Sequence, residues 1–69
     1  MNRDEWVEAF ARALGLEPPS QAEIDDLLAL AATAAHASER PAAPLACWLA
    51  GRSGKSLREL SEVAEGVGD

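Results

Sequence analysis

Three short sequences mark the starts of helices, and they constrain the fold of this chain more than any other feature. Residues 2–5, 20–23 and 56–59 each place an Asn or Ser three positions before a Glu. In such a capping box, each of the two side chains accepts a hydrogen bond from the other residue's backbone N–H. Apolar residues then recur every three or four positions, and no segment alternates as a strand does. The sequence therefore predicts an all-α protein.

Glycine and proline divide the chain between these starts. Gly15 can adopt the left-handed conformation that ends a helix in a Schellman motif, and Pro18 and Pro19 prevent continuation. Pro44 is tolerated in a first turn, and Gly51 is expected to close the helix that follows. We predict one domain over residues 1–69, a small antiparallel bundle of four short helices at about 3–14, 20–38, 43–50 and 57–65.

The predicted core consists of the large apolar residues at helical spacing. They are Trp6, Phe10, Leu14, Leu16, Ile24, Leu27, Leu28, Leu45, Trp48, Leu49, Leu57 and Leu60. A domain of 69 residues buries only about 60% of its unfolded surface. That size excludes a two-domain enzyme, a dinucleotide-binding fold and a complete nucleotidyltransferase. We therefore expect a protein that is not an enzyme, and one that gains stability as a homodimer by burying its alanine-rich second helix.

Charge is unevenly distributed along the chain. The total is −6, from 12 acids and 6 bases. Residues 1–26 carry seven acids and two bases, net −5, whereas residues 40–58 carry four bases and no acid, net +4. The acidic total argues against nucleic-acid binding, which needs an extended basic surface. A helix-turn-helix DNA reader is also disfavoured, because the third predicted helix is short and apolar.

No segment has the composition of a membrane span or a signal peptide. The first six residues include two acids, and the longest uncharged stretch covers only residues 27–38. A span needs about 20 apolar residues. We expect a cytoplasmic protein with no membrane contact.

The basic segment suggests one candidate site near the predicted fourth helix. Residues 51–56 end like a phosphate-binding loop, but the motif's first glycine and its preceding strand are missing. Free N–H groups at the helix start, flanked by Arg52, Lys55 and Arg58, could still receive an anion. Glu59 weakens that field, and the alternative interpretation is a solvated loop.

His36 and Arg40 form a second candidate, because they lie four residues apart at the end of the predicted second helix. They could present a cationic pair to a phosphate or a partner carboxylate. Alternatively, Arg40 caps the helix carbonyls while His36 packs at the turn. One histidine and one cysteine, Cys47, are too few for a metal site, and Cys47 is expected to pack between apolar neighbours. No catalytic residue, metal or cofactor is predicted.

Several segments carry a family resemblance. The chain resembles a small actinobacterial helical domain of unknown function. The resemblance is carried by Trp6 in an acidic N-terminal segment and by residues 14–16, 35–36 and 40–45. That domain occurs alone or fused to molybdenum cofactor guanylyltransferase, which attaches a nucleotide to molybdopterin. The resemblance covers about residues 4–51, and the family-motif residues that match are His36, Arg40, Pro41 and Pro44. It implies an accessory role with no catalytic residue of its own.

Three functional hypotheses follow. The first is a non-catalytic interaction domain linked to molybdopterin guanine dinucleotide biosynthesis, with the guanylyltransferase or a molybdoenzyme as partner. The second is a small anion-binding domain that uses Arg40, Arg52, Lys55 and Arg58 for a phosphate-bearing ligand. The third is a structural homo-oligomerisation module.

Overall fold

The computed structural model describes residues 1–67 and confirms the all-α prediction. Four helices follow one another: α1 (Arg3–Ala13), α2 (Gln21–Ala37), α3 (Ala42–Ser53) and α4 (Leu57–Gly66). Within the described residues there is no strand. The bounds differ from the predicted ones by at most three residues. The last two residues of the predicted 1–69 domain lie outside the described residues.

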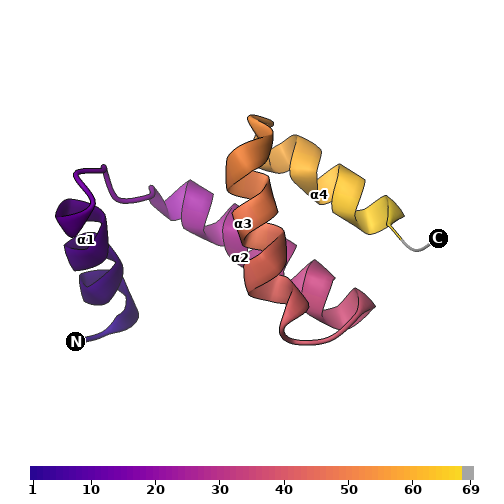
Figure 1. Cartoon of the computed structure of the whole chain (residues 1–69), viewed down its shortest axis with the longest axis horizontal. Helices are drawn as coiled ribbons and strands as arrows, with labels where there is room; N and C mark the ends of the chain where they lie inside the picture. Colours follow the sequence, from indigo (N-terminus) through magenta and orange to yellow (C-terminus); the bar gives the residue numbers. More distant parts are fainter. Residues whose placement is uncertain (68–69) are drawn as a thin grey trace.

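Helix α2 is the centre of the bundle. Helices α3 and α4 both pack against it, whereas α1 lies beyond its N-terminal end (Figure 1). Residues 14–20 form the linker that carries α1. The molecule is elongated as a result, with extents of 38 × 23 × 18 Å.

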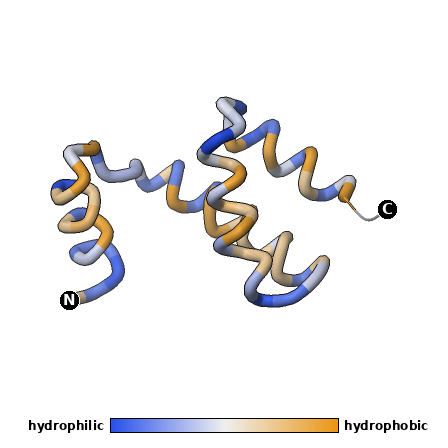
Figure 2. The backbone as a smooth tube through the Cα atoms, in the orientation of Figure 1, coloured by the Kyte–Doolittle hydropathy of each residue, from blue (hydrophilic) through white to orange (hydrophobic). Residues whose placement is uncertain are grey.

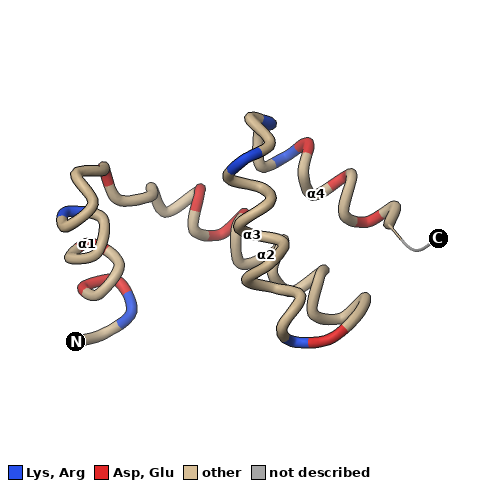
Figure 3. The backbone as a smooth tube through the Cα atoms, viewed as in Figure 1, with Lys and Arg blue, Asp and Glu red and all other residues tan. Residues whose placement is uncertain are grey.

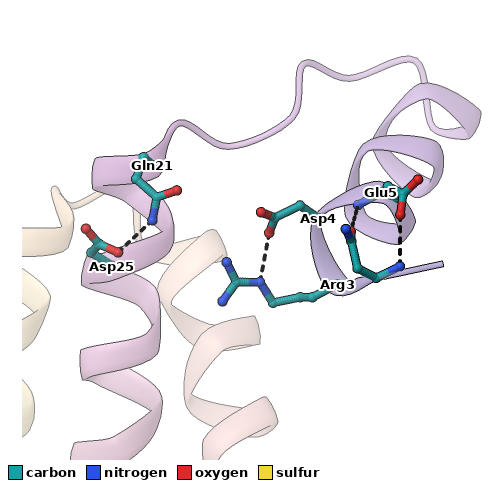
Figure 4. A network of polar contacts seen from close by, with 6 residues as sticks. Arg3, Asp4, Glu5, Gln21 and Asp25 are labelled. Carbon is teal, nitrogen blue, oxygen red and sulfur yellow. Dashed lines mark hydrogen bonds and ion pairs between the residues drawn. The ribbon is translucent and has the colours of Figure 1, made fainter.

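The predicted helix starts are present, and two of the three are complete capping boxes. At α1, the Glu5 N–H donates to Asn2 Oδ1 at 2.8 Å and the Asn2 N–H donates to Glu5 Oε1 at 3.1 Å (Figure 4). Ser20 and Glu23 make the same pair of bonds at 3.2 and 2.8 Å. At α4 the Glu59 N–H donates to Ser56 Oγ, but it is the Ser56 hydroxyl that donates to the Glu59 carboxylate. The third box therefore caps one backbone group rather than two.

The Schellman motif predicted at the end of α1 is confirmed. The Leu16 N–H donates to the Ala11 carbonyl at 2.9 Å, and the Gly15 N–H donates to the Arg12 carbonyl at 3.0 Å. Gly15 has a φ of 73°, in the left-handed region. This geometry turns the chain sharply into the linker.

The predicted end of the third helix was wrong. Helix α3 continues past Gly51 to Ser53, and the glycine with left-handed backbone is Gly54, whose φ is 73°. The Ser53 hydroxyl donates to the Ala50 carbonyl at 2.8 Å and accepts from the Lys55 N–H at 3.1 Å. These bonds satisfy backbone groups at the helix end, so Gly51 is left as an ordinary helical residue.

Most of the predicted core is exposed. The residues that are buried are Ala11, Leu30 and Ala50, none of which was predicted to be core. Of the predicted core residues, only Ile24, Leu27, Leu57 and Leu60 are even partly buried. The others are more than half exposed: Trp6, Phe10, Leu14, Leu16, Leu28, Leu45, Trp48 and Leu49.

Part of the error is a rotation of α2. The residues predicted to share its inward face are Ile24, Leu27, Leu28, Ala31, Ala35 and Ser38, of which Leu28 and Ser38 are exposed. The buried residue of α2 is Leu30, at 4% exposed, which lies outside that predicted set. Helices α3 and α4 both pack on α2, in which Leu30 is buried and Ala34 is partly buried. Small side chains such as that of Ala34 allow helices to approach closely, so close packing is reached with little burial of large side chains.

The two glycines of α3 provide a test of where this helix ends. We expect Gly54→Ala to lower the free energy of unfolding by about 1 kcal/mol, because alanine is strained in the left-handed region. We expect Gly51→Ala to raise it by about 0.5–1 kcal/mol, since a Cβ there meets no neighbouring atom and alanine favours a helix. Urea denaturation followed by circular dichroism measures both. Equal effects of the same sign would contradict this helix end.

The α2 capping box makes stability depend on pH. The Ser20 N–H, and with it the Ser20 hydroxyl, holds the pKa of Glu23 below its ordinary value of 4.5. Because the pKa of Glu23 is lower in the folded than in the unfolded chain, its ionised carboxylate stabilises the fold at pH values above about 4.5. This stabilisation is lost as the pH falls through the pKa of Glu23 in the folded chain. We expect Glu23→Gln, which keeps the acceptor oxygen, to flatten the acid limb of the stability curve between pH 5 and about pH 3.

Glu62→Gln is the matched control, because Glu62 lies exposed on α4 and, within residues 1–67, accepts no capping hydrogen bond. The Glu62→Gln variant should lose stability at acid pH as steeply as the parent chain does. If Glu23→Gln also lost stability that steeply, the capping box would not be the source of the pH dependence.

Candidate interaction site

The outer face of α3 is the most distinctive surface of the molecule. It consists of Leu45, Trp48, Leu49 and Arg52, and its three apolar side chains are all more than half exposed. Helix α3 crosses in front of α2 in Figure 2, and hydrophobic residues recur along its length. Isolated apolar residues on a surface are ordinary, but a contiguous set indicates a binding surface.

Trp48 and Arg52 form an ordered pair at the centre of this face. The Arg52 guanidinium carbon lies 4.7 Å from the centroid of the Trp48 ring, in cation–π geometry. The indole is nonetheless 60% exposed. The sequence did not predict this pair, because Gly51 was expected to end the helix and Arg52 to lie in the loop that follows. The four-residue spacing would have been the signal, because it puts both side chains on one helix face.

Helix α1 presents a second apolar surface, the α1 stripe, made of Trp6, Phe10 and Leu14. All three are more than half exposed. The rings of Trp6 and Phe10 stack with centroids 5.0 Å apart and planes inclined by 30°. Stacking orders the two rings without covering their outer surfaces.

A groove of about 370 Å³ lies between α2, α3 and α4. We call it the α2–α4 groove, and its lining is almost entirely apolar: Thr33, Ala34, Ala37, Ser38, Ala42, Leu45, Ala46, Leu49, Ala64 and Val67. The Thr33 hydroxyl donates to the Ala29 carbonyl at 3.1 Å, which satisfies it within α2. The groove therefore offers a surface for apolar side chains rather than for polar ligands.

The four predicted anion-binding cations are not brought to one place. Arg40 lies in the turn before α3, and Arg52, Lys55 and Arg58 lie around the turn after it (Figure 3). Arg52 lies in the last turn of α3, a helix of 12 residues that is about 18 Å long, so Arg40 and the other three cations lie toward opposite ends of it. Only the last three share a neighbourhood.

The α4 N-terminus, where the anion was predicted to bind, is already partly satisfied by the chain. The Glu59 N–H donates to Ser56 Oγ, and the Glu59 carboxylate lies beside that hydroxyl. The Lys55 N–H donates to Ser53. A bound anion would have to compete with this carboxylate for the same positive field.

His36 and Arg40 are both exposed, His36 in the last turn of α2 and Arg40 in the turn that follows. The predicted capping of α2 carbonyls by Arg40 is not seen, because within residues 1–67 its side chain makes no hydrogen bond. Backbone bonds from Ala42 to Glu39 and from Ala43 to Arg40 close this turn instead. Cys47 is partly buried, which agrees with its predicted packing role.

Two features that would indicate other functions are absent from residues 1–67. No cluster of three or more His, Cys, Asp or Glu side chains is arranged to hold a metal ion in this range. Among its helices, none combines the length and the apolar character needed to cross a bilayer.

Comparison with known protein families gives a match over nearly the whole chain. The profile of a family described as a domain of unknown function (DUF6457) matches residues 1–68. No curated protein and no solved structure matches the chain.

The Trp48–Arg52 pair should contribute measurably to stability. We expect Arg52→Met, which keeps an apolar stem but removes the guanidinium, to lower the free energy of unfolding by about 0.5–1 kcal/mol. Arg58→Met removes a cation from the first turn of α4, where positive charge is unfavourable, and should not destabilise the chain. Urea denaturation at low ionic strength compares the two variants. An equal loss for both would contradict a specific role for the pair.

Proposed function

The chain belongs to the DUF6457 family of domains of unknown function, and from this premise we propose that it is a non-catalytic protein-interaction domain. Its partner binds the outer face of α3. The observation that carries the proposal is the Trp48–Arg52 pair, ordered at 4.7 Å and open to solvent on a face that is otherwise apolar.

Physical chemistry supports this use of the outer face. Tryptophan and arginine are the residues most enriched among those that dominate the free energy of protein–protein binding. The indole ring already limits the freedom of the Arg52 side chain, so less conformational entropy is lost on binding. Leu45 and Leu49 extend the contact to either side and would exclude water from it. A partner that fits this face offers an apolar pocket for the indole and a carboxylate for the guanidinium.

The partner that we propose is molybdenum cofactor guanylyltransferase, or a molybdoenzyme that receives its product. Support comes from the resemblance to an actinobacterial domain that occurs alone or fused to this transferase. The matching motif residues are all exposed and lie between the last turn of α2 and the first turn of α3: His36, Arg40, Pro41 and Pro44. The domain would act from the surface of the transferase and would contribute no group to the reaction.

Calorimetric titration of the purified guanylyltransferase with the 69-residue chain tests this proposal. We expect binding at micromolar concentration, and we expect Trp48→Ala to weaken it about 30-fold because a central anchor is lost. Val63→Ala is the matched control: Val63 is also an exposed apolar residue, but it lies on α4 outside the outer face. Absence of binding at 100 µM, or equal affinities for the two variants, would refute the proposed interaction.

A further inference from the structure

Helix α1 has little support from the rest of the described chain. The extensive helix contacts within residues 1–67 are those of α2 with α3 and with α4, whereas α1 lies apart at the end of its linker (Figure 1). A helix of 11 residues is marginal in water, even when capped, unless an apolar face packs against something. The α1 stripe is such a face, and its side chains are more than half exposed. A second molecule that covered the stripe would therefore stabilise α1.

The other sides of α1 face its own chain. Asp4 and Val7 line clefts that α1 forms with Pro19 and the start of α2. Glu8 and Arg12 line a cleft that α1 forms with the linker. None of these clefts includes a residue of the α1 stripe. The stripe is therefore free, and it can be covered without bringing these charged side chains into the contact.

The shape of this face complements itself. Trp6, Phe10 and Leu14 are spaced by four residues, and such a row forms a ridge inclined to the helix axis. The neighbouring row, on the side away from the domain, includes Ala9 and Ala13, whose small side chains leave a shallow groove beside the ridge. Two helices that pack such ridges into each other's grooves cross at about −50°, the commonest packing class. A second copy of the same face can therefore fill the groove.

Charges at the two ends of α1 favour one direction for such a pair. The first turn carries Asp4 and Glu5, with Arg3 paired to Asp4 at 2.8 Å, and the last turn carries Arg12. In an antiparallel pair, each acidic first turn lies toward a basic last turn, and the two helix dipoles also oppose each other. A parallel pair would bring like ends together. An antiparallel second copy is thus the occupant that both shape and charge favour.

We propose that two copies of this chain form a homodimer through α1, packed antiparallel about a twofold axis at Phe10. The two Phe10 rings meet at the axis, and Trp6 of each copy lies on Ala13 of the other. Both copies bury the same surface, as a closed dimer requires. Helix α2, whose alanine-rich face the sequence suggested for a dimer, instead carries α3 and α4. The outer face of α3 stays open, so this dimer does not depend on the function proposed above.

The available area suits a weak dimer. The accessible surface is 5462 Å² at 7.3 kDa, whereas the scaling for folded monomers gives about 4,200 Å². The α1 stripe can take roughly 400 Å² from each copy into the contact, since a fully buried aromatic side chain covers about 150–250 Å². That is about half of what a standard interface takes from each partner. We therefore expect a dissociation constant of tens to hundreds of micromolar.

Sedimentation equilibrium of the 69-residue chain measures the dimer directly. We expect the mass to rise from 7.3 kDa toward twice that value between about 10 µM and about 1 mM. Phe10→Ser removes the central ring from both copies and should raise the dissociation constant about 30-fold. Phe10 is 51% exposed in the single chain, so this variant should keep its helices by circular dichroism. A parent chain that stays at 7.3 kDa at about 1 mM overturns the proposal.

An exchange of large and small residues tests the antiparallel arrangement. Ala13→Trp fills the groove that Trp6 of the other copy occupies, and Trp6→Ala removes the ring that fills it. Each change alone should raise the dissociation constant at least about 10-fold. The double variant again places a ring against an alanine and should return to within about 3-fold of the parent chain. A double variant as weak as Ala13→Trp alone would show that these residues do not meet, and it would overturn the proposal.

Ala32→Trp is the matched control, because it makes the same change at an exposed alanine of α2. It should leave the dissociation constant of the dimer unchanged. Loss of the dimer in this variant would place the contact on α2 and overturn the proposal.

Trp6 also gives an optical reading of the contact. The chain has two tryptophans, so Trp6 is the only one left in Trp48→Phe. Its fluorescence should shift to shorter wavelength as the concentration rises, because the dimer covers the indole. Trp48 lies on the outer face of α3, so this variant should weaken the proposed partner and leave the dimer intact. A dimer mass without the Trp6 shift would place the interface elsewhere and overturn the proposal.

Discussion

The close packing of α3 and α4 on α2 is the constraint on which the rest of this structure depends. It is made largely by small side chains around Leu30 and Ala50, the two buried residues at the centre of the bundle. Small residues let helix backbones approach closely, but they remove little apolar area from water. The bundle therefore holds its helices in place while most of its large apolar residues stay outside.

That division of roles explains why the surface, rather than the interior, carries the candidate function. A chain of 69 residues cannot enclose a reaction centre and also bury a sufficient core. Here the aromatic residues lie on α1 and α3, where Trp6 stacks on Phe10 and Arg52 lies over Trp48. Each pair is ordered by its own helix before any partner arrives. The arrangement suits recognition, because ordering side chains in advance reduces the entropy lost on binding.

The sequence predicted local structure well and side-chain burial poorly. Capping at Ser20 and the Schellman turn at Gly15 depend on atoms within a few residues, so short motifs were sufficient to find them. The end of α3 was missed because two glycines compete there, and hydrogen bonds of Ser53 favour Gly54. That single error hid the Trp48–Arg52 pair, since it moved Arg52 out of the helix.

By itself the sequence determined that the chain forms four helices, where they begin and how charge is distributed along the chain, because each follows from neighbouring residues. Only the tertiary structure decided which face of each helix is inside. Periodicity shows that a helix has an apolar face, but an alanine-rich helix such as α2 offers several faces of nearly equal hydrophobicity. The choice among them fell to the packing of α3 and α4, which buried Leu30 and left Leu28 in solvent.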